Sequence, residues 1–224
     1  MKVKTRILFL ILIPVLAGLI IFGYQSLVYV PSWYYPVFVE PEDQQKLRDD
    51  FTVISAKINS AMQKPDEFDI SLSANDINRF ISGIAYLDPR LKDMIPPEIM
   101  DPVVQMEDNY LKVGALLDHK GKKVFASLSL KVIPQGDTLI IDDLRAKIGF
   151  YTIPTAVLKK HADRVLKKFT DHGIDEILNA KQCQNLFSYP NGDYDFRIKS
   201  LIARNGSLLA TIEPVERIKR KAWR

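Results

Sequence analysis

Histidine, cysteine and paired carboxylates are the residues that could hold a metal or move protons in this chain. The histidines (His119, His161 and His172) lie too far apart for metal-ligand spacing, and Cys183 is the sole cysteine. The sequence has no glycine-rich phosphate loop and no Gly-x-Ser-x-Gly motif. We therefore expect no catalytic, cofactor-binding or metal-binding residue and no cofactor, and we interpret the protein as one that is not an enzyme.

The neighbouring carboxylates Asp142 and Asp143 are the strongest remaining candidates for acid–base chemistry. Adjacent strand positions point to opposite faces of a sheet, so these two side chains cannot form a dyad unless a bulge intervenes. Alternation places Asp142 on the apolar side of its strand, which indicates a sheet edge, a bulge or a polar contact inside a pocket. A hydrolase that used Asp142, Asp143 and His161 is a third, weaker hypothesis about function.

Charge excludes one large class of partner. The net charge of +4 comes mostly from Lys2, Lys4 and Arg6 at the start, and the tail 217–224 adds five more basic residues with no acid. The body between these ends is therefore mildly acidic and lacks the basic surface that nucleic-acid binding requires. We interpret the tail as solvated, with contact to anionic lipid as the alternative.

The first thirty residues predict a membrane anchor. The apolar stretch 7–30 would be about 36 Å long as a helix, and the hydrocarbon core is about 30 Å thick. The basic residues precede it, so the N-terminus should be cytoplasmic and the rest extracytoplasmic, in a single-pass topology in the cell membrane. Trp33, Tyr34 and Tyr35 suit the far membrane interface. The alternative is a secretory signal cleaved after Ala17, which would also export the domain.

The exported part has the pattern of an α+β fold, with amphipathic helices packed on one face of an antiparallel sheet. Helices are expected at 40–62, from Ser73, at 154–170 and at 174–180. Strands are expected at 68–72, 103–106, 110–117, 122–133 and 138–151, followed by a hairpin at 194–213 around Asn205-Gly206. We expect one sheet of about five to seven strands. The division is an anchor (1–30), an interfacial segment and helix (31–66), the α+β domain (67–216) and the tail (217–224).

The apolar face of the central strands and the helix from 154 to 170 would enclose the ligand site, if there is one. A solid core and a hollow one look alike in sequence. The candidate lining residues are Leu128, Leu130, Ile140, Asp142, Leu144, Ile148, Phe150, Leu158 and His161.

Three stretches, SLSANDINRFI, VFASLSLKVIPQGDTL and AKIGFYTIPTAVLKK, resemble in order and type a bacterial group of membrane-anchored proteins, the YpmS-like proteins. The resemblance covers roughly residues 1–170 and implies an anchored envelope protein of uncharacterised activity. It assigns no catalytic residue.

Two functions fit these features. The first is a membrane-anchored extracytoplasmic binding module of the bacterial cell envelope, for a lipid or another amphipathic ligand. The second is a non-enzymatic scaffold that binds an envelope protein partner through the sheet edge, the tail or the membrane helix. The one-sided apolar sheet and the tether favour the first slightly.

Overall fold

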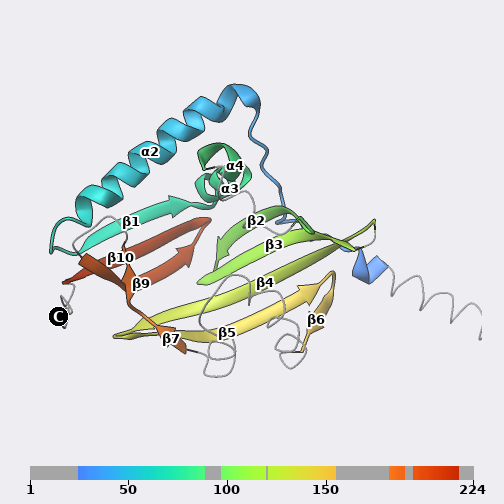
Figure 1. The fold of residues 1–224 in the computed structure, drawn as a ribbon. Coiled ribbons are helices and arrows are strands. Elements are labelled where there is room, and N and C mark those ends of the chain that lie inside the picture. Colours follow the sequence, from blue (N-terminus) through green and yellow to red (C-terminus); the bar gives the residue numbers. More distant parts are fainter. Residues whose placement is uncertain (1–24, 89–96, 120, 155–181, 190–193, 217–224) are drawn as a thin grey trace, which may run out of the picture.

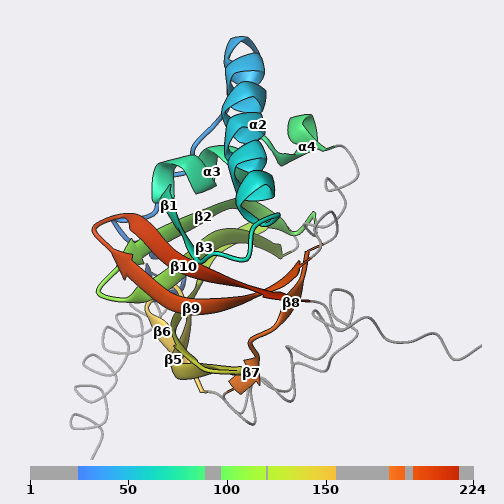
Figure 2. The ribbon, with the colours of Figure 1, turned by 90° about the vertical axis from the view of Figure 1, so that its left-hand side faces the viewer.

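The protein folds around two antiparallel sheets (Figures 1 and 2), and the computed structural model describes residues 25–88, 97–119, 121–154, 182–189 and 194–216. The larger sheet is a meander of β2 (Ile99–Glu107), β3 (Tyr110–His119), β4 (Lys122–Gln135), β5 (Thr138–Ile148) and β6 (Tyr151–Ile153), and β7 (Gln182–Gln184) also pairs with β5. The smaller sheet has the order β1 (Phe68–Ser73), β10 (Ser207–Glu216), β9 (Tyr194–Arg204) and β8 (Phe187–Ser188). The α+β class and the meander are confirmed, whereas the expectation of one sheet is wrong.

The helices among the described residues gather near β1 and β2. They are the 3-10 helix η1 (Pro41–Asp43), α2 (Gln44–Ala61), α3 (Ala74–Ser82) and α4 (Ile84–Leu87). Helix α3 packs on β2, and the long helix α2 packs on α3 and α4 and passes over β1 (Figure 1). The predicted start at Ser73 is confirmed, because its hydroxyl oxygen accepts a 3.0 Å hydrogen bond from the Asp76 backbone N–H.

Several predictions fall outside the described residues: the helices at 154–170 and 174–180, the tail, and residues 7–24 of the anchor. Within the part of the chain that the structure describes, no helix is both long enough and apolar enough to cross a membrane.

A two-residue turn sets the register of β9 and β10 in the smaller sheet, and a β-bulge shifts the register of β4 and β5 in the larger one. Asn205 and Gly206 have φ of 51° and 73°, the left-handed values that a two-residue hairpin turn between β9 and β10 requires. In the larger sheet, Lys131 lies opposite Asp143 and Val132 opposite Ile141, so Asp142 is the extra residue of a β-bulge. The bulge also corrects the prediction for Ile140, because it shifts alternation by one residue and puts Ile141, not Ile140, on the face of Leu144.

Two buried asparagines join the elements. The side-chain oxygen of Asn78 in α3 accepts a hydrogen bond from the Val104 N–H (2.6 Å), and its side-chain nitrogen donates one to the Val104 carbonyl (2.9 Å). These two bonds attach α3 to the edge of β2. Asn185 bonds in the same way to both backbone groups of Ile198 in β9 and also donates to the Gly136 carbonyl (2.8 Å) in the β4–β5 turn. The side chain of Asn185 is thus a hydrogen-bonded joint between the two sheets. They are also linked by the Asn109 N–H, which donates to the Ala203 carbonyl (2.7 Å), and by the Gly206 N–H, which donates to the Met106 carbonyl (2.9 Å).

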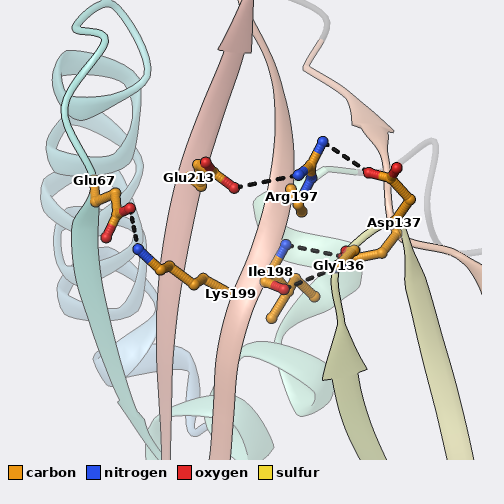
Figure 3. A network of polar contacts seen from close by, with 8 residues as sticks. Glu67, Gly136, Asp137, Arg197, Ile198, Lys199 and Glu213 are labelled. Carbon is orange, nitrogen blue, oxygen red and sulfur yellow. Dashed lines mark hydrogen bonds and ion pairs between the residues drawn. The ribbon is translucent and has the colours of Figure 1, made fainter.

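Charged side chains lie near Gly136 and Ile198, the two residues that Asn185 bonds, as Figure 3 shows. Arg197 of β9 lies between Asp137 of the β4–β5 turn (2.8 Å) and Glu213 of β10 (3.7 Å). Lys199 pairs with Glu67, just before β1, and this hydrogen bond raises the pKa of Lys199. The Arg197–Asp137 pair therefore links the same two elements as Asn185, β9 and the β4–β5 turn, whereas the other two pairs join β9 to β10 and to the start of β1.

The segment that follows the predicted anchor is part of the fold. Tyr34 is only 7% exposed, packs with Val103 and Phe125, and donates a 2.8 Å hydrogen bond to the Asp101 carbonyl. Trp33 covers Gly114, where an added Cβ would lie 2.6 Å from its ring. Of the three aromatic residues expected at the membrane interface, Tyr34 is therefore a core residue, Trp33 is half-buried, and Tyr35 is exposed.

Candidate ligand-binding site

Helix α2 packs tightly against the rest of the protein at its two ends and leaves unfilled space beneath its middle. Leu47 near its start is fully buried and fits against Gly83, where an added Cβ would lie 2.1 Å from the Leu47 side chain. Met62, just past its end, is 1% exposed. Between them Ile54 and Ile58 are only half-buried, although they belong to the same apolar stripe. The middle of this stripe has space beneath it.

The space between α2 and β1 is a cleft of about 390 Å³. Apolar side chains from Ile54, Ile58 and Ala61 of α2 and from Phe68, Ile70 and Leu72 of β1 line it. The β1 residues alternate with the exposed Asp69 and Ser71, so the strand presents one apolar face to the helix. We call this space the α2 cleft. Its volume lies within the ~300–1,000 Å³ typical of small-molecule sites.

A second apolar hollow of about 330 Å³ continues along the same helix. Its walls are Phe51 of α2, Ile77, Phe80, Ile81, Ile84 and Leu87 of α3 and α4, and Asp88. The rings of Phe51 and Phe80 meet edge to face with their centroids 5.4 Å apart. Because Phe51 and Ile54 are one helical turn apart, the two hollows share one stripe of α2.

The open end of the α2 cleft is polar. Lys57 lines both the cleft and an adjoining mouth, which also includes Lys64, Asp66 and Glu67. Glu67 is engaged by Lys199, and Asp69 accepts a 2.8 Å hydrogen bond from Thr211. Lys57 makes no ion pair with any residue in the described ranges, so its ammonium group is available to a ligand at the mouth.

The lining predicted from sequence lies elsewhere. Leu128, Leu130, Leu144 and Ile148 are half-buried and share the apolar face of β4 and β5. Phe150 is exposed beyond the end of β5, while Leu158 and His161 lie outside the described residues. The α2 stripe and the alternation of β1 were both visible in the sequence, but nothing there indicated that these two elements face each other.

The carboxylates of the larger sheet are held by separate partners. Asp143 accepts hydrogen bonds from Tyr110 (2.8 Å) and Arg145 (2.5 Å), and both lower its pKa. The pKa of Tyr110 is raised because its hydroxyl donates to Asp143. Asp142 is half-exposed and pairs with Lys131 at 2.8 Å. Although the bulge removes the argument from alternation against a dyad, each of the two acids is engaged by its own basic partner. Among the described residues no cluster of histidine, cysteine and acidic side chains could hold a metal ion.

Comparison of the chain with protein families, with curated proteins and with solved structures finds no match.

Proposed function

We propose that the protein is a membrane-anchored, extracytoplasmic module that binds an amphipathic lipid, with one acyl chain in the α2 cleft. The observation that carries the proposal is the apolar cleft between α2 and β1. Helix α2 packs tightly only at its two ends, and the isoleucines between them are half-buried. An apolar chain can therefore occupy the space beneath the helix without disrupting the fold. This keeps the type of ligand expected from sequence and moves its site from the meander to α2.

The apolar lining argues for a chain rather than a compact polar ligand. Each methylene that leaves water for such a lining contributes about 0.8 kcal/mol. The dissociation constant should therefore fall about fourfold per added methylene. It should stop falling when the chain has filled the cleft.

Lys57 argues for an acidic headgroup. It stands at the boundary between apolar lining and polar mouth, where the carboxylate or phosphate of a bound lipid would emerge. A charge-assisted hydrogen bond to a lysine at such a boundary is stronger than a neutral one. A fatty acid is therefore the simplest probe of the proposal.

The test is titration calorimetry of residues 25–224 with saturated fatty acids of increasing length, with native mass spectrometry to give the stoichiometry. Ile58→Trp fills the cleft and should weaken binding at least tenfold. Val53→Trp places the same ring on the exposed side of α2 and should leave binding unchanged. Lys57→Gln should weaken binding of the acid but not of the matching alcohol.

Failure of all chain lengths to bind the wild-type domain would exclude the lipid-binding proposal. It would favour the scaffold function. That function predicts a protein partner that is captured by the full chain, and the Ile58→Trp and Val53→Trp variants should either both lose this partner or both keep it. Equal loss of fatty acid binding in both tryptophan variants would place the ligand outside the α2 cleft.

A further inference from the structure

One end of the larger sheet carries a continuous apolar surface that the proposed lipid site does not use. The surface consists of residues 27–30 and of Phe150 and Tyr151 at the β5–β6 turn, all exposed. Phe150 keeps 64% of its surface exposed, and its ring lies 4.3 Å from that of Tyr29, centroid to centroid. We call these six residues the corner surface.

The backbone holds the corner surface together. The Phe150 N–H donates to the Ser26 carbonyl at 2.8 Å, and the Gly149 N–H donates to Phe125 of β4 at 2.7 Å. Gly149 has φ of 56°, and a Cβ there would lie 2.1 Å from the Ser26 carbonyl oxygen. The close approach of residues 26 and 27 to this turn therefore depends on glycine. The chain just after residue 24 is fixed to the β5–β6 turn, with no intervening linker.

Basic residues lie at the same end of the sheet. In an antiparallel meander the β3–β4 and β5–β6 turns fall at one end, as Figure 1 shows. Lys122 and Lys123 begin β4 there and are exposed. Aromatic and apolar side chains beside lysines match the headgroup–acyl boundary of a bilayer that contains anionic lipid.

We propose that the corner surface is a second membrane contact, in which Phe150 and Tyr151 enter the bilayer interface beside the anchor and Lys122 and Lys123 meet the headgroups. The occupant is a bilayer because the apolar stretch 7–30, the predicted anchor, runs into this surface, of which its last residues 27–30 are a part. The proposal concerns how the domain sits on the membrane and does not depend on any ligand in the α2 cleft.

The experiment uses the full chain in vesicles of phosphatidylcholine and phosphatidylglycerol. A nitroxide is attached to Phe150→Cys or to Tyr151→Cys in a Cys183→Ser background, and collisions with oxygen and with a water-soluble nickel chelate are measured. The control is Ile133→Cys. Ile133 is also an exposed apolar residue of the larger sheet, but it lies near the far end of β4, roughly 35 Å along the strand from Lys122.

The expected result is an oxygen-to-nickel collision ratio at positions 150 and 151 severalfold higher than at position 133. Thermal melts of each variant, compared with the Cys183→Ser parent, verify that the label has not unfolded the domain. Equal ratios at all three positions in a folded, vesicle-bound protein would overturn the proposal, and so would failure of the full chain to float with vesicles. Neither result would bear on fatty acid binding by residues 25–224.

Discussion

At the scale of single residues, the polar face of the larger sheet is held by charge-assisted hydrogen bonds. Tyr110 and Arg145 both reach the Asp143 carboxylate, and the Arg145 guanidinium also lies over the Tyr110 ring, 5.5 Å from its centroid. These contacts favour the ionised form of Asp143, and so they lower its pKa. The group is close to solvent, so the expected effect is modest.

This arrangement predicts a pH dependence. Because the pKa of Asp143 is lower in the folded state, its contribution to stability is present above the unfolded pKa of about 4 and is lost as pH falls through the folded pKa. The gap in unfolding free energy between wild type and Asp143→Asn should therefore be largest above about pH 5 and should shrink on acidification. Urea unfolding from pH 6 to pH 2 measures it.

Asp66→Asn is the matched control, because Asp66 is exposed and makes no ion pair with the residues described. The gap between Asp66→Asn and wild type should stay near zero across the range. A gap for Asp143→Asn that did not change with pH would show that its contacts contribute packing rather than charge.

At the scale of elements, features determined by neighbouring residues could be predicted from the sequence. The Ser73 cap and the Asn205-Gly206 turn each depend on a few adjacent side chains, and both are present. The alternation predicted for β4 is not matched by burial, because Phe125, on the face opposite Leu128 and Leu130, is fully buried while those two are half-buried. The bulge at Asp142 was one of the alternatives that its polarity indicated. Its consequence for Ile140 was not predicted, because a bulge is defined by the partner strand and not by its own sequence.

The same reasoning explains why the interface prediction was wrong for Tyr34. An aromatic residue after an apolar stretch is typical of a membrane boundary. Tyr34 instead finds a pocket formed by Val103 and Phe125, which lie about 70 and 90 positions further along the chain. Nothing near Tyr34 in sequence indicates that pocket.

Gly149 provides a test of how residues 26–35 are attached to the larger sheet. Gly149→Ala and Gly121→Ala both put alanine at positive φ, which costs about 1–2 kcal/mol. Only Gly149 has backbone within reach of the new Cβ, whereas Gly121 has no atom within 4 Å of it. Gly149→Ala should therefore destabilise the protein clearly more, and it should shift Trp33 fluorescence to the red as residues 26–35 loosen from the sheet. Equal losses in urea unfolding and an unchanged spectrum would contradict this attachment.

At the scale of the whole molecule, the division into two sheets could not be predicted, because it depends on partners far apart in sequence. Strand β1 pairs with β10, so Phe68 lies opposite Ile212. Alternation identifies each strand but does not name its partner. The candidate site was missed for the same reason, since the α2 cleft exists only where α2 passes over β1.

Replacing the side-chain nitrogen of Asn185 should lower the unfolding free energy strongly. Asn185→Asp replaces an amide that donates to the carbonyls of Gly136 and Ile198 with an oxygen that cannot donate. We expect a loss of about 3 kcal/mol in unfolding free energy, since two buried acceptors lose their donor. Asn75→Asp, the same change at an exposed position of α3, should cost far less. Chemical denaturation of both variants measures the difference, and similar losses would show that the joint is not held by Asn185.

The attachment of Ser26 to the β5–β6 turn has a consequence for encounters on the membrane. A domain on a flexible linker tumbles and samples many heights above a bilayer, whereas this one has its β5–β6 turn bonded to Ser26, within the predicted anchor segment. If the anchor predicted within residues 7–30 spans the bilayer, every copy holds its α2 cleft at one height and one angle. The rate at which the cleft encounters other proteins of the same membrane would then depend on two-dimensional diffusion and on rotation about the membrane normal.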